Sequence, residues 1–186
     1  MREVDAVKSQ DAIKLISFLL ERHFGEQMRD VWEIGLNLAL RISDLLAIRF
    51  CDIDEDTLTI CEQKTGKLAR IKLNAKTKAR IDTIREAHPD HQYLFQSYRS
   101  PGAIKRPPTP LSRRAVTKAF MLVGSELKLA LGTHSMRKTR GYMMYQQYKD
   151  LGRVMRMLRH SSEAVTLRYI GINQQQVDHD FLSLEL

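Results

Sequence analysis

Two short segments with alternating apolar residues interrupt a chain that otherwise shows helical periodicity. These segments are Thr57–Cys61 and Leu68–Leu73, and they flank the turn Lys64–Lys67, which contains Gly66. Alternation at period two on both sides of a glycine-containing turn predicts a β-hairpin. Apolar residues spaced three and four apart predict helices before and after it. We therefore expect a mainly α chain with one small antiparallel β-sheet, an α+β fold.

Three helices are expected before the hairpin. Ser9 is in position to cap the first helix, and the second follows Gly25 and should end near Leu40–Arg41. Ser43 is expected to cap a short third helix over residues 44–49.

The chain after the hairpin is expected to return to helix over Ala75–Ala87. Tyr93–Phe95 suggests a short strand, and residues 97–110 form a basic, proline-rich loop. Ser112 should cap a helix that runs through Leu127, and three or four further helices should complete a single domain over residues 1–186.

The net charge points to a polyanionic partner. Lysines and arginines outnumber acidic residues by enough to give a formal charge of +8. A domain this basic most simply binds nucleic acid, although a basic surface can also serve solubility alone.

Other function classes receive little support from composition. Cys51 and Cys61 are too few for a disulfide framework and lack metal-site spacing, and His88 and His91 are expected to be surface residues. No apolar run approaches the ~20 residues that span a bilayer, and the N-terminus lacks a signal-peptide core. We expect a cytoplasmic protein without a metal site or a membrane segment.

Cleavage of a phosphodiester without a metal ion makes specific demands on side chains. Fixed cations must meet the charge that develops on the phosphate oxygens, and arginine suits this because its planar fork stays protonated. Histidine can donate a further hydrogen bond, lysine can protonate the leaving oxygen, and tyrosine can form a covalent ester. The chain offers a candidate for each role, in the order Arg41, a lysine of the 64–67 turn, His134, Arg137, His160 and Tyr169.

This series resembles the catalytic domain of the tyrosine recombinases, or phage integrases. The motif His134-Ser-Met-Arg137 is followed by Leu158-Arg-His160 and then Tyr169, with separations of 23 residues from Arg137 to His160 and 9 from His160 to Tyr169. The resemblance covers about residues 9–172. It is greatest to the short recombinases of the fimbrial phase-variation type, which lack a separate N-terminal core-binding domain.

The resemblance implies a role for each residue. Tyr169 would attack a DNA phosphate to form a 3′-phosphotyrosyl link, and a lysine would protonate the departing 5′ oxygen. Lys64 matches the family position better than Lys67, which stays open as the alternative. The transition state would be stabilised by Arg41, His134, Arg137 and His160. The reaction would use no cofactor.

Four positions depart from the family pattern without removing a catalytic group. Ala39 and Arg159 stand where glycine is usual, Asp44 replaces a glutamate, and Lys138 stands where a second histidine is frequent. Arg159 adds charge beside the third motif.

The expected partner is double-stranded DNA. Four cationic residues would contact it. Three lie near the start of the helix capped by Ser112, namely Arg113, Arg114 and Lys118, and the fourth is Lys67 of the hairpin turn. By analogy with the family, four protomers would assemble on two DNA sites. The tail, about residues 173–186, would be exchanged between protomers or would fold back on its own domain. A need for accessory DNA-bending proteins stays open.

The sequence favours site-specific recombination in DNA integration, excision or inversion over two other functions. A type IB topoisomerase uses similar residues but only relaxes supercoils. A DNA-binding regulator with an inactive site belongs to another class, and the complete residue set argues against it.

Overall fold

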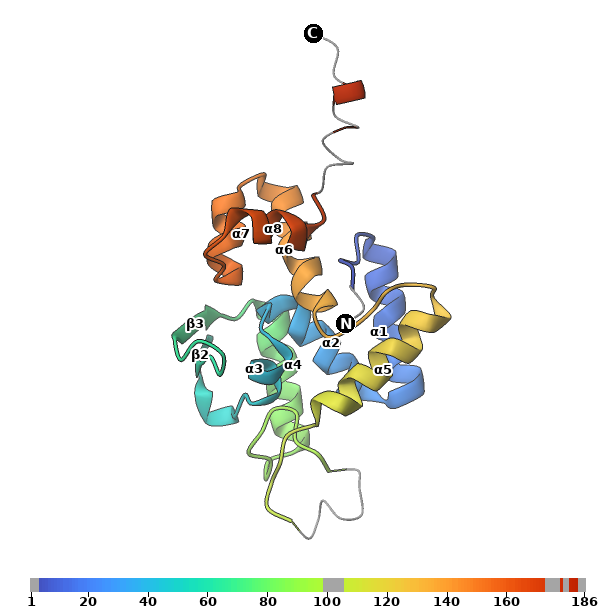
Figure 1. The fold of residues 1–186 in the computed structure, drawn as a ribbon. Helices are drawn as coiled ribbons and strands as arrows, with labels where there is room; N and C mark the ends of the chain where they lie inside the picture. The colour runs from blue at the N-terminus through green and yellow to red at the C-terminus, as the bar shows by residue number, and fades with distance from the viewer. Residues whose placement is uncertain (1–3, 99–105, 173–177, 179–180, 184–186) are drawn as a thin grey trace.

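The computed structural model describes residues 4–98, 106–172, 178 and 181–183, and it confirms a mainly helical fold with one small sheet (Figure 1). The helices before the sheet are α1 (Gln10–Phe24), α2 (Glu26–Leu38), α3 (Ile42–Leu46) and the 3-10 turn η1 (Phe50–Asp52). Those after it are α4 (Ala75–Ala87), α5 (Arg113–Glu126), α6 (Ser135–Tyr148), α7 (Leu151–Leu158) and α8 (Glu163–Ile170).

The sheet contains the expected hairpin. Strand β2 (Thr57–Cys61) pairs antiparallel with β3 (Leu68–Lys72), so that Cys61 lies opposite Leu68 at the turn. Gly66 has a φ of +66°, a left-handed conformation that glycine adopts without steric cost. A third strand, β1 (Ile53–Asp54), pairs with β2 at the other edge. A strand of two residues is too short to show alternation, so the sequence did not predict β1.

Two apolar clusters divide the interior. The larger one holds Trp32 of α2 against Phe120 of α5, with ring centroids 5.6 Å apart, and it extends beneath the sheet and α3. The smaller one joins α7 and α8 through Val154, Leu158 and Ile170. Figure 1 shows α6 running from the larger body to this smaller group. A side chain near the start of α6 can therefore lie between the two clusters.

Helix α6 meets α2 closely at Gly35. A Cβ atom on Gly35 would lie 2.3 Å from Sδ of Met136, so a larger residue there would require the Met136 side chain to move. This close approach brings the next residue, Arg137, to the C-terminal end of α2.

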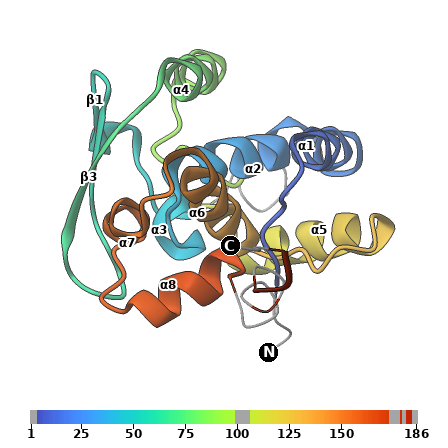
Figure 2. The same ribbon diagram turned by 90° about the horizontal axis from the view of Figure 1, so that it is seen from above.

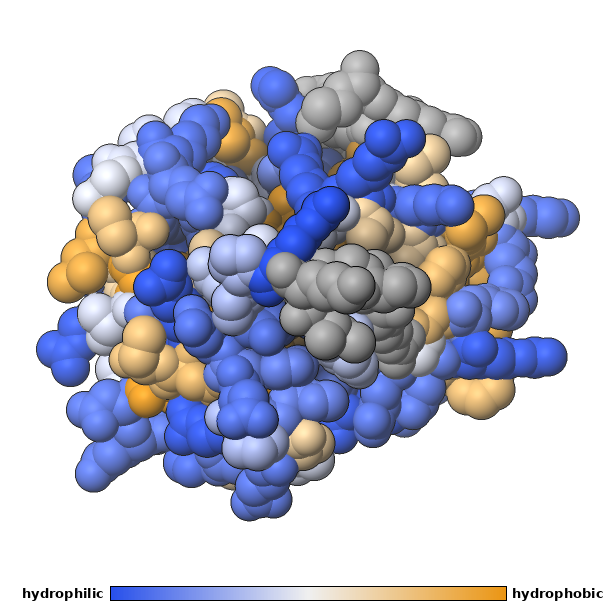
Figure 3. Space-filling model, turned by 90° about the horizontal axis from the view of Figure 1, so that it is seen from below, coloured by the Kyte–Doolittle hydropathy of each residue, from blue (hydrophilic) through white to orange (hydrophobic). Residues whose placement is uncertain are grey.

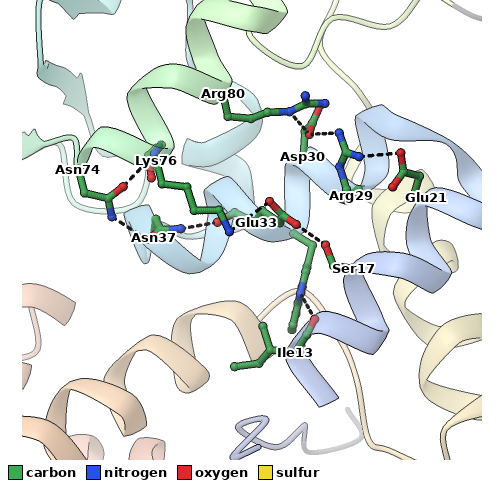
Figure 4. A network of polar contacts seen from close by, with 12 residues as sticks. Ile13, Ser17, Glu21, Arg29, Asp30, Glu33, Asn37, Asn74, Lys76 and Arg80 are labelled. Carbon is green, nitrogen blue, oxygen red and sulfur yellow. Dashed lines mark hydrogen bonds and ion pairs between the residues drawn. The ribbon is translucent and has the colours of Figure 1, made fainter. Parts of the chain in front are cut away.

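Polar contacts fix α4 against α2 (Figure 4). Arg80 donates two hydrogen bonds to the buried carboxylate of Asp30, at 2.6 and 2.9 Å. At the other end of the network, Asn74 Nδ2 donates to Asn37 Oδ1 at 2.8 Å. The Asn74 side chain also caps α4 by accepting from the backbone N–H of Thr77. Charged and amide side chains thus hold a helix whose own apolar surface is small.

Three predicted details are wrong. The helix α2 ends at Leu38, because Ala39 turns into the left-handed region with a φ of +51°. The helix α3 begins at Ile42 with Arg41 as its N-cap, so Ser43 does not cap it. Burial of Ile42, Leu45 and Leu46 outweighs the capping preference of serine. Tyr93 forms only an isolated bridge with Arg49 and no strand.

The lower face of the molecule is largely hydrophilic, with apolar residues in separate patches (Figure 3). In the part of the chain that the structure describes, no helix combines the length and the apolar composition that crossing a membrane requires.

Candidate functional site

Tyr169 of α8 lies between two histidines from different segments. Its hydroxyl is 3.0 Å from Nδ1 of His134, the residue just before α6. Its ring meets the ring of His160 edge-on, with centroids 5.0 Å apart. His160 follows the end of α7 and is held by a 3.2 Å contact between Nδ1 and Oγ1 of Thr166. Figure 2 shows that α6, α7 and α8, which carry or adjoin these residues, lie close together.

Burial keeps these three side chains neutral near pH 7. It lowers the pKa of His134, and nearby arginines and Lys138 lower it further. Burial, with the charges of Arg137 and Arg41, lowers the pKa of His160 to about 4. The pKa of the Tyr169 hydroxyl is raised by burial, although the same two arginines oppose this. A neutral imidazole with its proton on Nε2 can accept the Tyr169 proton at Nδ1 of His134.

Arg137 is buried in the interface between the two clusters, with only 2% of its surface exposed. It donates from Nη1 to the carbonyl oxygen of Ala39 at 2.8 Å and from Nη2 to the carbonyl oxygen of Leu158. These carbonyls lie at the ends of α2 and α7. The guanidinium is therefore fixed in place by the backbone and in turn joins the two helix ends.

Both departures from the family's glycines fall at these helix ends. Ala39 and Arg159 are the C-caps of α2 and α7, with φ angles of +51° and +52°. An L-residue in this region costs about 1–2 kcal/mol relative to a right-handed conformation. Glycine would adopt it freely, so both positions have the geometry that the family's usual residue suits.

Arg41 faces a buried acid. Its Nη1 lies 3.2 Å from Oε2 of Glu62, which follows β2 and has a fully buried side chain. Glu62 also accepts hydrogen bonds from Thr65 Oγ1 at 2.8 Å and from Arg159 Nε at 2.5 Å. Burial alone would raise the pKa of Glu62, but these bonds and the charges of Arg159 and Arg41 lower it to about 2. Glu62 is thus an anion between two guanidinium groups.

The hairpin turn carries both candidate lysines on its exposed surface. Lys64 and Lys67 are exposed, and among the described residues Nζ of Lys64 forms no hydrogen bond or ion pair. The turn itself is anchored to α3, because the backbone N–H of Gln63 donates to Oδ1 of Asp44 at 2.9 Å. The structure therefore places Lys64 on an anchored turn, two residues after Glu62.

Two cationic surfaces adjoin the site. The exposed side chains of Arg113, Arg114 and Lys118 line an open groove of about 810 Å³ along α5. A second cleft, of about 750 Å³, lies beside Tyr169 and is lined among others by Lys8, Lys128, Lys138 and Arg168. Nζ of Lys138 stands 5.5 Å from the centre of the Tyr169 ring.

Sequence reasoning missed Glu62 as a member of the site. A signal was present, because Leu58 and Ile60 alternate as the inward residues of β2 and position 62 continues that alternation. A carboxylate at an inward position needs a cationic partner, and Arg41 and Arg159 provide it.

The fold is that of a tyrosine recombinase catalytic domain. The structure superposes on lambda integrase in a solved tetramer bound to a Holliday junction with a TM-score of 0.71, at 18% sequence identity, over 91% of this chain and 49% of that one. This chain spans only about half of the longer protein.

Residues 6–176 match the phage integrase family, and the chain belongs to that family. It is 34% identical over 176 residues to a probable integrase/recombinase, YoeC, of Bacillus subtilis strain 168, covering 94% of this chain and 93% of that protein. It is 30% identical over 166 residues to the tyrosine recombinase XerC of Caldanaerobacter subterraneus subsp. tengcongensis, covering 83% of this chain and 44% of the relative. The predictions of family, fold class and a tyrosine-type site-specific recombinase are confirmed.

Proposed function

We propose that this recombinase cleaves DNA with Tyr169 as its nucleophile. The observation that carries the proposal is the hydroxyl of Tyr169, which lies 3.0 Å from a histidine nitrogen and beside a buried arginine. The tyrosine oxygen attacks the phosphorus and forms a 3′-phosphotyrosyl ester as the bond from phosphorus to the 5′ oxygen breaks. Nδ1 of His134 takes the tyrosine proton. Attack by the 5′ hydroxyl of a second strand reverses the step, so no external energy source is consumed.

Arginines and His160 stabilise the charge that develops on the phosphate. Arg137 keeps N–H donors beyond the two that the carbonyls of Ala39 and Leu158 accept. Arg41 stands at the start of α3 with a guanidinium that is only partly engaged by Glu62. Lys64 protonates the 5′ oxygen, which the exposed position of the hairpin turn allows.

Double-stranded DNA is the proposed partner. The groove along α5, with Arg113, Arg114 and Lys118, and the cleft beside Tyr169 provide cations that neutralise phosphates. Lys67 would add a contact from the hairpin turn. With DNA as the partner, we also propose that the protein acts in the cytoplasm.

We also propose that the described part acts as one catalytic domain and that four protomers assemble on two DNA sites. The solved lambda integrase tetramer on a Holliday junction supports this arrangement. Most of the tail, residues 173–186, lies outside the described residues, but Phe181 and Leu182 are 81% and 83% exposed. Apolar side chains so exposed suit contact with a neighbouring protomer.

A covalent trap tests this function. A duplex is first selected from a random-sequence pool by its binding to the protein. Versions of this duplex are then prepared with a nick at successive positions. When the nick lies close to the cleavage site, the short fragment that carries the 5′ hydroxyl diffuses away and cannot reverse the reaction. We expect a protein–DNA adduct that survives denaturation. Paired intact duplexes should yield joined products, which separates recombination from relaxation by a topoisomerase. Binding without any adduct would instead support an inactive regulator.

A further inference from the structure

Glu62 makes unequal contacts with its two arginines. Arg159 Nε donates a directed hydrogen bond to Oε1 at 2.5 Å, whereas Arg41 Nη1 approaches Oε2 to 3.2 Å without hydrogen-bond geometry. Within the described residues, Nη1 of Arg41 is a buried donor that lacks a hydrogen-bond partner. The carboxylate is therefore held by directed hydrogen bonds from Arg159 at Oε1 and from Thr65 at Oε2, and of the two arginines Arg159 is its closer partner.

The charges show why this inequality matters. If Glu62 faced Arg41 alone, its carboxylate would neutralise a guanidinium that the reaction needs for the phosphate. The ion pair with Arg159 leaves one net positive charge in the three-residue group. The hairpin turn and the end of α7, which carry Glu62 and Arg159, lie side by side in Figures 1 and 2.

The backbone at Arg159 adds a second observation. An arginine occupies a left-handed C-cap with a φ of +52°, where glycine would fit without strain. Its long side chain is only 24% exposed and reaches Glu62 from there. A strained position that carries a long charged side chain is explained if the side chain does something that glycine cannot do.

We propose that Arg159 is a positioning residue, which holds the Glu62 carboxylate so that Arg41 stays available for the scissile phosphate. This inference rests on the proposed function. It assigns to Arg159 a role through Glu62 rather than a contact with DNA.

The test is a double-mutant cycle with Glu62→Gln and Arg159→Gly, read as the rate of adduct formation on the selected nicked duplex. Arg159→Gly should lower the rate about tenfold, because Glu62 then closes on Arg41. The double variant with Arg159→Gly and Glu62→Gln should react within about threefold of the wild-type rate, because the uncharged amide does not neutralise Arg41. Loss of packing alone would not be reversed by a second substitution at Glu62.

Lys149→Gly is the matched control. Lys149 is an exposed C-cap of α6 with a φ of +50°, and its Nζ donates to Gln146 and stands 5.6 Å from the centre of the Tyr145 ring, both in its own helix. The glycine there should relieve the same backbone strain and leave the rate unchanged. Arg159→Met, which keeps a long side chain but has neither a hydrogen-bond donor nor a charge, should lose rate as Arg159→Gly does.

Melting curves without DNA keep the inference separate from the proposed function. Glu62→Gln should lower the melting temperature more in the wild type than in Arg159→Gly, because only the wild type loses the pair. A wild-type protein that forms no adduct would contradict the proposed function, and the melting comparison would still decide whether the pair exists. A wild-type rate in Arg159→Gly, a double variant slower than Arg159→Gly, or equal losses of melting temperature would overturn the inference.

Discussion

The hydroxyl of Tyr169 lies 3.0 Å from Nδ1 of His134, although the two residues are 35 positions apart and belong to opposite ends of the α6–α8 group. Because burial keeps the imidazole neutral and the phenol protonated, the contact joins a proton donor to a proton acceptor. The structure therefore contains the alignment that removal of the tyrosine proton requires.

Replacement of His134 should slow cleavage and leave DNA binding nearly unchanged. His134→Ala removes the acceptor of the tyrosine proton, and a positioned acid–base group typically contributes 10²–10⁴-fold, so we expect a loss of at least about 10²-fold. Single-turnover adduct formation measures it. His91→Ala, in the stacked pair with His88 outside the site, should react at the wild-type rate. An equal effect of both substitutions would argue against a role for His134.

The general acid can be assigned by a change of leaving group. A 5′-bridging phosphorothiolate leaves without needing a proton, so it should restore the rate of Lys64→Ala but not that of Arg41→Ala. Lys67→Ala serves as the neighbouring control on the same turn. If the sulfur substrate rescues Lys67→Ala instead, the acid lies three residues further along the chain.

The depressed pKa of His160 should make stability depend on pH. The folded protein holds the pKa at about 4, below the ordinary 6.5, so neutral His160 contributes stability above pH 6.5. As pH falls from 6.5 to about 4, the unfolded chain binds the proton first and this contribution is lost. Between pH 6.5 and pH 4, the melting temperature should fall less steeply with decreasing pH for His160→Gln than for the wild type. An equal dependence of the melting temperature on pH in the two proteins would mean that His160 titrates normally in the folded protein.

The ion pair between Arg80 and Asp30 should matter for stability and not for chemistry. Arg80→Ala removes two hydrogen bonds from the buried Asp30 carboxylate and leaves it the longer 3.5 Å bond from Arg29, and loss of one partner of such a pair costs about 3 kcal/mol of unfolding free energy. Chemical denaturation measures it. Lys76 is on the same helix as Arg80, and its exposed Nζ lies 3.8 Å from Glu33 of α2. Lys76→Ala should change stability by less than about 0.5 kcal/mol. Similar losses for both would show that burial of Asp30 is unimportant.

Much of the fold followed from periodicity. Alternation predicted the hairpin of β2 and β3, and serine caps predicted the starts of α1 and α5, where Ser9 and Ser112 accept backbone N–H bonds. Local signals sufficed there because each cap or turn satisfies its own backbone groups. The start of α3 could not be predicted this way, since burial of Ile42 depends on residues distant in the sequence.

The site was predictable as a series of residues but not as a set of contacts. Motif order brought Arg41, His134, Arg137, His160 and Tyr169 into consideration, and the structure gathers them around the ends of α2 and α7. Their catalytic roles stay predictions. The link from Arg41 through Glu62 to Arg159 joins three separate segments, so no local pattern could reveal it.

The most direct test of the central claim is covalent trapping by Tyr169→Phe. This substitution keeps the aromatic ring, which packs against His160, and removes only the oxygen that would attack the phosphate. On the selected nicked duplex, the wild type should accumulate a denaturation-resistant adduct, whereas Tyr169→Phe should bind the duplex with similar affinity and form none. A persistent adduct with the phenylalanine variant would contradict the account, because the nucleophile would then be another residue.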